Sequence, residues 1–151
     1  MFKKLMNKKL LKNQKGLTLI ELLAVIVILA IVAAIAVPAI GNIIQNSKYN
    51  AIKADAINVL NAANLYYTDT TSSSAKDPVT TQDLIDEGFL KSVGKLPLDA
   101  KVSKTKLQLN TTVTGVLNYT INFENATLET INKDTKKGSD ITSSYVVGSN
   151  K

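Results

Sequence analysis

The acid with the most distinctive position in this sequence is Glu21, which stands at the start of a long apolar run. A carboxylate costs free energy in apolar surroundings unless a positive group pairs with it, so its chemistry is ion pairing. The chain contains neither His nor Cys. Serine-histidine-aspartate catalysis, cysteine-histidine catalysis, the usual zinc sites and disulfides are therefore excluded. We expect no enzyme activity, no cofactor and no metal site.

A second group of acids lies far along the chain and carries less information. Asp83, Asp86 and Glu87 form a small carboxylate cluster in the segment TTQDLIDEGFL. No other metal-ligating or catalytic residue type accompanies them. We interpret them as the solvated face of a short helix that Thr80 or Thr81 caps and that stops at Gly88.

The element that carries Glu21 is long enough to cross a membrane. Sixteen consecutive apolar residues begin at Leu22, and the whole apolar stretch covers residues 17–40. A membrane-spanning helix needs about 20 residues. Glu21 lies near the end of the stretch, where an acid costs less than the roughly 3 kcal/mol that it costs at the bilayer centre. We therefore predict that the segment inserts.

The positive charge of the chain is concentrated before this segment. The first sixteen residues contain six lysines and no acid, whereas 12 lysines and 12 acids balance each other from Leu17 onward. By the positive-inside rule, the N-terminus stays in the cytoplasm and the remainder is exported. The pI near 9.4 reflects this leader, so we infer no specific nucleic-acid site. The leader lysines are Lys3, Lys4, Lys8, Lys9, Lys12 and Lys15.

Two simpler interpretations of the apolar segment are open. Ala34-Ile35-Ala36 looks like the cleavage site of an ordinary secretory signal, although this segment is longer than such signals and carries a carboxylate. Alternatively, the segment is a plain signal anchor in which Glu21 is incidental.

The sequence KGLTLIE at residues 15–21, followed by the apolar run and Pro38, resembles the N-terminus of type IV pilin precursors and pseudopilins. The resemblance implies cleavage after Gly16 by a membrane peptidase, N-methylation of Leu17, and a filament-assembly role for Glu21. Most members have Phe where this chain has Leu17. Pro38 matches a proline that is common in the family's apolar helices. The resemblance covers about residues 3–45.

Elementary electrostatics supplies a mechanism for this motif. Cleavage would give Leu17 an ammonium group, four residues from Glu21 on the same helix face. The ammonium of a neighbouring subunit could serve equally well, and pairing between subunits would set their axial register. The alternative is that Glu21 only complements the helix dipole, which is worth about 0.3 to 1 kcal/mol.

Beyond the apolar run, the pattern becomes that of an amphipathic helix. Pro38 and Gly41 should kink or loosen the helix. Apolar residues then recur at helical spacing up to about Tyr67, which predicts one buried face. A Ser- and Thr-rich loop follows at residues 68–78. The predicted buried face consists of Tyr49, Ile52, Ala56, Val59, Ala63 and Tyr66.

The remaining sequence alternates as strands do. Leu107 and Leu109 are two residues apart, and residues 117–123 place four apolar side chains on one face. We predict a third strand at Thr127 to Ile131, after a turn at Glu124-Asn125-Ala126, and a fourth at Ser144 to Val147. N-glycosylation patterns at Asn110, Asn118 and Asn125 arise easily by chance in a Thr-rich sheet, and we assign them no function.

The predicted architecture is α+β, a pilin-like lollipop. A long N-terminal helix with a hydrophobic first half packs against a small antiparallel sheet of three to four strands. The expected divisions are a basic leader (1–16), a transmembrane and filament-core helix (17–40), its amphipathic continuation (41–67) and a globular head (68–151).

The expected function is a structural subunit of a bacterial type IV pilus. The resemblance implies as partners other copies of the chain, other pilins, the prepilin peptidase and methyltransferase, and the assembly platform in the membrane. The precursor would span the cytoplasmic membrane once, with its N-terminus inside, and the mature subunit would form extracellular filaments. The absence of Cys, the all-Lys basic set and the Asn-rich chain favour a Gram-positive source.

Two alternatives to this function remain. A competence or type II secretion-like pseudopilin would share the whole N-terminus. A signal-anchored surface protein that never polymerises would retain its leader.

Overall fold

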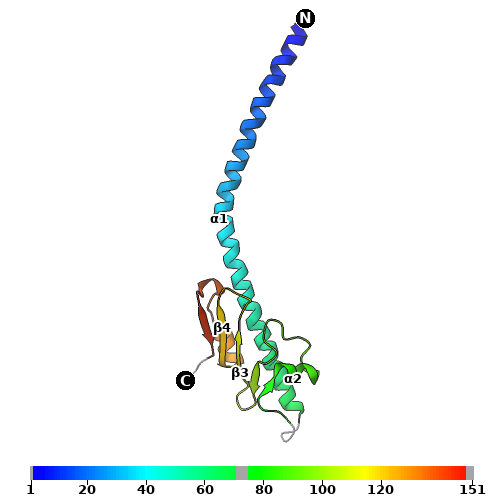
Figure 1. The fold of residues 1–151 in the computed structure, drawn as a ribbon, viewed down its shortest axis with the longest axis vertical. Helices are drawn as coiled ribbons and strands as arrows, with labels where there is room; N and C mark the ends of the chain where they lie inside the picture. The colour runs from blue at the N-terminus through cyan, green and yellow to red at the C-terminus, as the bar shows by residue number, and fades with distance from the viewer. Residues whose placement is uncertain (1, 71–74, 149–151) are drawn as a thin grey trace. The chain divides into compact units, whose positions relative to one another are not determined.

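The structure of the protein is a computed structural model that describes the backbone of residues 2–70 and 75–148, and side chains in these ranges from Thr18 onward. The chain divides into two compact units, Met1–Gly41 and Asn42–Lys151. We describe each unit by itself. Helix α1 (Phe2–Asp69), labelled in Figure 1, contributes to both.

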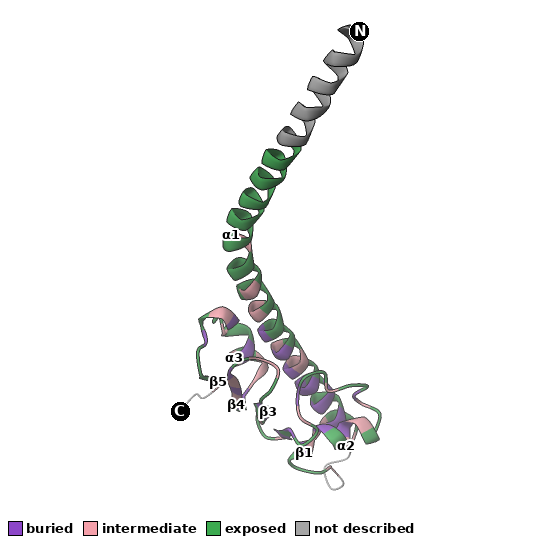
Figure 2. Cartoon of the chain, turned by 45° about the horizontal axis from the view of Figure 1, so that its top comes forward, coloured by how far each residue is buried: buried purple, intermediate pink, exposed green. Residues whose placement is uncertain are grey.

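In the first unit, α1 is apolar on every side from Leu22 to Ile40, and Leu19 and Ile20 precede the single acid Glu21. Its large aliphatic side chains are half or more exposed in nearly every case, from 49% at Val27 to 72% at Ile35. Figure 2 shows this part of the helix as exposed almost throughout. A helix that is apolar all round needs lipid or other apolar helices around it.

In the second unit, α1 has one buried face, as the sequence predicts. Figure 2 shows this face as a stripe of buried residues on the later turns of α1. The small side chains of Ala56 and Ala63 let the sheet approach the helix closely. Tyr49 and Tyr66 occupy the two ends of this buried face. The predicted face is confirmed, because Tyr49, Ile52, Ala56, Val59 and Ala63 are 0% exposed and Tyr66 is 4% exposed.

Within residues 75–148, five strands form a mixed sheet in the order β1-β2-β3-β4-β5. All neighbouring pairs are antiparallel except β4 and β5, which run parallel. The predicted α+β class, a long N-terminal helix with a small sheet, is confirmed. The sheet is slightly larger than the predicted antiparallel sheet of three to four strands, and one of its pairings is parallel. The strands are β1 (Val79–Thr80), β2 (Lys101–Ser103), β3 (Gln108–Val113), β4 (Thr120–Ala126) and β5 (Ser144–Val147).

The parallel pair arises because the segment after β4 is helical, which corrects the third predicted strand. Helix α3 (Leu128–Lys133) occupies most of the segment that the sequence assigned to a strand. Thr127 is its N-cap and accepts a hydrogen bond from the amide of Thr130. A threonine cap that fixes the first helical turn outweighs the β propensity of this short segment. The chain then crosses over and returns as β5, parallel to β4.

Strand β4 shows the predicted alternation, with differences at both ends. Ile121 and Phe123 in the strand, and Tyr119 just before it, are buried as expected. Leu117, which also precedes the strand, is half-buried. The predicted turn at residues 124–126 is instead the end of β4. Here Asn125 takes a positive φ of 50°, and the register of β3 against β4 shifts between Leu109 and Thr111. A β-bulge thus replaces the turn.

Two short helical segments complete the second unit. Helix α2 (Thr81–Asp86) has Thr80 as its N-cap, as predicted, and Gly88 follows its end with φ 81°. Leu107, which the sequence placed in a strand, instead occupies the turn between β2 and β3 with φ 47°. A 3-10 turn, η1 (Gly138–Asp140), lies between α3 and β5.

Candidate functional site

The candidate assembly site lies on the N-terminal half of α1. Glu21 is exposed on this helix, one turn after Leu17, and apolar side chains follow it for several turns. Among the residues whose side chains the structure describes, none forms an ion pair with Glu21. The Gly16–Leu17 junction and the leader lysines lie outside those residues. Cleavage and methylation at this junction therefore stay predictions.

Pro38 and Gly41 lie further along the same helix. Pro38 is inside α1 and exposed. Its nitrogen carries no hydrogen, so the carbonyl of Ala34 loses its usual helical partner. A Cβ at Gly41 would meet no atom within 4 Å, so close packing does not require a glycine there. The kink assigned to these two residues stays a prediction.

From Thr18 to Asp69, α1 is long and apolar enough to cross a membrane. The Ile43 and Ile44 side chains, which follow Gly41, are 62% and 49% exposed. The exposed apolar surface therefore continues about one turn beyond the predicted span. Lys48 is the first charged residue that follows it.

A buried polar network centred on Asp134 fastens the α3–η1 region to α1. The carboxylate of Asp134 accepts hydrogen bonds from the hydroxyls of Tyr49 and Tyr145, the latter at 2.8 Å. Lys53 Nζ lies 3.3 Å from Asp134 Oδ2 and donates to the backbone carbonyl of Asp134 at 2.5 Å. The backbone amide of Lys136 donates to Asp134 Oδ1. One carboxylate thus joins α1, β5 and the loop after α3.

The protonation behaviour of this network follows from its geometry. Burial opposes ionisation of Asp134, but the hydrogen bonds from Tyr49 and Tyr145 outweigh it, so the pKa of Asp134 lies below its ordinary value. Burial, and then the bond to Asp134, raise the pKa of Tyr145 to about 12 and that of Tyr49 further. Near neutral pH, Asp134 is therefore ionised and both tyrosines are protonated donors.

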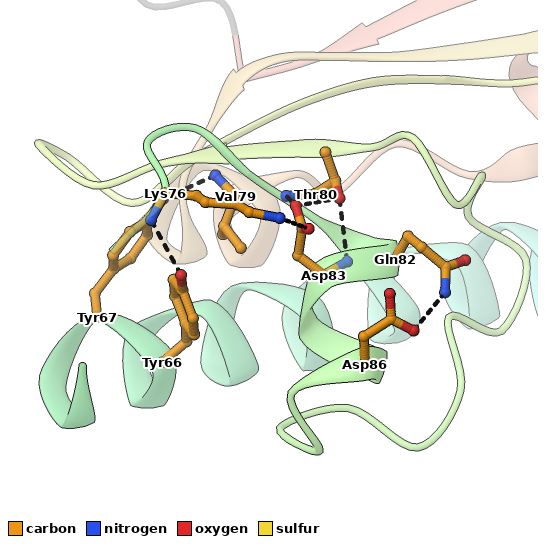
Figure 3. A network of polar contacts seen from close by, with 8 residues as sticks. All are labelled: Tyr66, Tyr67, Lys76, Val79, Thr80, Gln82, Asp83 and Asp86. Atoms are coloured by element: carbon orange, nitrogen blue, oxygen red, sulfur yellow. Dashed lines mark hydrogen bonds and ion pairs between the residues drawn. The ribbon is translucent and has the colours of Figure 1, made fainter. Parts of the chain in front are cut away.

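A second network positions α2 and the strand before it (Figure 3). The hydroxyl of Tyr66 accepts a hydrogen bond from the amide of Lys76, and the hydroxyl of Tyr67 accepts one from the amide of Val79. Tyr67 donates in turn to the carbonyl of Val102 in β2 at 2.8 Å. Both tyrosines lie in the last turns of α1, so they fix where β1 begins.

The acids of α2 are engaged locally, which refines the predicted solvated face. Asp83 forms the capping box with Thr80 and an ion pair with Lys76. Asp86 accepts a hydrogen bond from the Gln82 amide at 2.8 Å, and Glu87 is exposed. Within the described part of the chain, no group of three or more acids is arranged to hold a metal ion.

The sequence analysis did not predict a positively charged groove near the start of the second unit. Lys136 and Lys137 line an open groove of about 320 Å³ together with Asn46 and Asn50 of α1. The local signal was three lysines within residues 133–137. Their position beside α1 could not be predicted from the sequence, because it depends on a contact between residues that are 93 positions apart. In this contact, the Ser139 amide donates a hydrogen bond to Asn46 Oδ1 at 2.9 Å.

Comparison with known proteins identifies the N-terminal segment. Residues 11–37 match the family model described as the prokaryotic N-terminal methylation motif, and the match includes Gly16, Leu17 and Glu21. No curated protein and no solved structure matches the chain significantly. The matched segment is a type IV prepilin-like leader followed by most of the apolar run. Together with the apolar helix, it supports a type IV pilin-like precursor.

Proposed function

We propose that the protein is a structural subunit of a bacterial type IV pilus. It is made as a membrane-inserted prepilin, cleaved after Gly16, methylated at Leu17 and polymerised through the apolar half of α1. The observation that carries this proposal is the coincidence of the methylation motif at residues 11–37 with a helix whose apolar side chains are exposed on all sides. Such a surface is stable in lipid first and among other apolar helices afterwards.

Glu21 gives the polymer its register. In a bundle of apolar helices, an acid finds its best partner in the new ammonium at Leu17, either its own or that of a neighbouring subunit. Stranding one member of a buried ion pair costs about 3 to 5 kcal/mol. Where the ammonium belongs to a neighbouring subunit, this cost repeats at every subunit, so only one axial offset between neighbours is favourable.

The partners follow from this life cycle. The precursor meets the prepilin peptidase and methyltransferase at the cytoplasmic face, and the mature subunit meets the assembly platform in the membrane. Other copies of the chain and other pilins then surround its apolar helix in the extracellular filament. The protein acts in this scheme as a structural element and not as an enzyme.

A substitution at Glu21 tests the proposal. Glu21→Leu should leave cleavage intact, because the scissile bond is unchanged, but processed subunits should accumulate in the membrane and be absent from the sheared filament fraction. Glu21→Asp retains the carboxylate and is the matched control, so it should still yield filaments. Intact mass should show that filament subunits lack residues 1–16 and carry one additional methyl group.

Two results would contradict the proposal. An uncut leader on the native protein would indicate a signal-anchored surface protein. Normal filaments from Glu21→Leu would show that the carboxylate only complements the helix dipole and that other contacts set the register.

A further inference from the structure

A lysine cluster, defined here as Lys136 and Lys137, lies at the beginning of the second unit. Both lysines belong to the loop between α3 and η1. That loop lies against Asn46 and Asn50 of α1, with which it lines the groove of about 320 Å³. The hydrogen bond from the Ser139 amide to Asn46 holds the following turn in place.

The loop is anchored by the buried network, so the positions of its charges are defined by packing. Asp134 at the start of the loop is held by Tyr49, Tyr145 and Lys53. A Cβ on Gly138, at the other end of the loop, would lie 2.5 Å from the Gln45 carbonyl oxygen and 2.8 Å from the Cβ of Tyr49. The loop therefore approaches α1 at a distance that only glycine permits.

The charges around the cluster do not cancel. Lys53 compensates Asp134, and Lys133 pairs with Glu129 at 2.5 Å. Lys136 and Lys137 are exposed, and within the described ranges their ammonium groups have no hydrogen-bond or ion-pair partner.

One nearby acid reduces the positive charge without neutralising it. Asp140 lines the wider groove beside Lys136 and Lys137, and it accepts a hydrogen bond from Ser139. With the paired Lys133 and Asp134 set aside, two ammonium groups and one carboxylate of the described residues line this groove. The surface therefore retains a positive charge of about one.

Chain connectivity limits how far along the chain this loop can lie from the end of the apolar span. A helix of 24 residues, such as residues 17–40, is about 36 Å long, against about 30 Å for the hydrocarbon core. Asn46 follows Ile40 by six residues, which is about 9 Å of helix. Such a short separation allows the lysine cluster to reach the depth at which the lipid headgroups are found.

The helix surface around the cluster has the composition of a membrane interface. Ile43 and Ile44 are largely exposed. Ile43 precedes Asn46 by three residues, so the two residues share a helix face. Lysines whose stems lie along apolar surface and whose ammonium groups reach outward suit a headgroup layer.

We propose that Lys136 and Lys137 bind anionic phospholipid headgroups and dock the globular head on the membrane surface before polymerisation. This inference rests on the proposed membrane-inserted precursor. A lysine near an anionic surface strengthens binding by about fivefold, so reversing the charge of two lysines should weaken docking at least about 25-fold. High salt should weaken it as well.

The test uses the full chain reconstituted in vesicles of phosphatidylcholine, with or without phosphatidylglycerol. Because the protein has no cysteine, Thr135→Cys can carry a single fluorophore on the exposed loop, and a headgroup-labelled nitroxide lipid can quench it. We expect stronger quenching in the anionic vesicles and loss of this difference at high salt. Lys136→Glu combined with Lys137→Glu should abolish the difference.

The matched control is Lys101→Glu combined with Lys106→Glu. These lysines are exposed in β2 and in the turn after it, and the change in total charge is the same. This variant should retain the lipid-dependent quenching. A milder pair, Lys136→Gln with Lys137→Gln, should weaken quenching by an intermediate amount.

The outcomes separate this inference from the proposed function. Equal quenching in both vesicles, with the full chain inserted, overturns the lipid-docking inference alone. Failure of the full chain to float with either vesicle overturns the membrane-anchored precursor and the inference with it. Binding of double-stranded DNA through Lys136 and Lys137, without any dependence on lipid charge, would assign the cluster to nucleic acid and also overturn the inference.

Discussion

The hydroxyl of Tyr49 on α1 donates a hydrogen bond to the carboxylate of Asp134, which lies 85 positions later in the chain. Tyr49 is fully buried, and its ring packs edge-to-face against Tyr145 at 6.2 Å between centroids. Lys53 lies over the same ring, 5.5 Å from its centroid. This contact joins the amphipathic part of α1 to the segment that follows α3 and so closes one end of the core.

Removing residues 1–44 should leave a soluble, folded head. The deletion removes the exposed apolar surface up to Ile44 and retains Tyr49 through Tyr66, which cover the sheet. Size-exclusion chromatography and circular dichroism would check for a folded monomer. Persistent aggregation of the fragment would contradict the idea that its core is complete without the N-terminal half of α1.

Tyr49→Phe should destabilise this head by about 1.5 to 3 kcal/mol, because a buried hydrogen bond to an ionised carboxylate is lost while the ring remains. Urea unfolding gives the free energy. Tyr145→Phe removes the bond to the other carboxylate oxygen from a less buried ring, and a smaller loss is expected. Unchanged stability of Tyr49→Phe would show that the contact contributes little.

The stability of the head should fall as the pH drops from about 4 to about 2. The ion pair with Lys76, together with hydrogen bonds from Thr80, holds the pKa of Asp83 at about 2, against an ordinary value of 3.8. The unfolded chain therefore takes up this proton at a higher pH than the folded chain, so acid favours unfolding.

Asp83→Asn is the comparison for this pH dependence. It should reduce the slope of stability against pH in that window, since Asn retains the capping geometry without titrating. Asp134 is present in both proteins and contributes equally to each. Identical slopes for the two proteins would rule out the assigned role of Asp83.

Gly94→Ala should be more destabilising than Gly115→Ala. Both glycines have positive φ, 63° and 76°, which costs an alanine about 1 to 2 kcal/mol. Only at Gly94 would the new Cβ collide with a side chain, since it would lie 2.1 Å from the carboxylate of Asp55.

That collision would also disturb the hydrogen bond from the Lys95 amide to Asp55, which is 2.8 Å long. We expect an extra loss of about 1 to 3 kcal/mol at Gly94. Thermal unfolding of the two variants would measure the difference. Equal losses would mean that the loop moves away from α1 at no cost.

Gly16→Val should block maturation and leave a full-length precursor in the membrane, because a peptidase acting at this position must approach the backbone closely. Gly41→Val places the same substitution where no atom lies within 4 Å of a Cβ, and it should be processed normally. Immunoblots of membrane fractions distinguish the two lengths. Normal cleavage of Gly16→Val would remove the basis for the assigned leader.

The motif around Gly16 and Glu21 and the apolar run could be identified from the sequence because they depend only on neighbouring residues. The buried face from Tyr49 to Tyr66 was equally predictable, since helical periodicity directly encodes a one-sided environment. The alternation of Tyr119, Ile121 and Phe123 gave β4 for the same reason.

Only the tertiary structure decided the parallel pairing of β5, the helix that begins after Thr127, and the partners of Asp134. Each depends on contacts between residues far apart in the chain, which local patterns do not specify. The Thr127 cap competed with β propensity in a segment too short for periodicity to separate helix from strand. Lys136 and Lys137 were visible as charges in the sequence, but only the packing of their loop against α1 placed them beside Asn46.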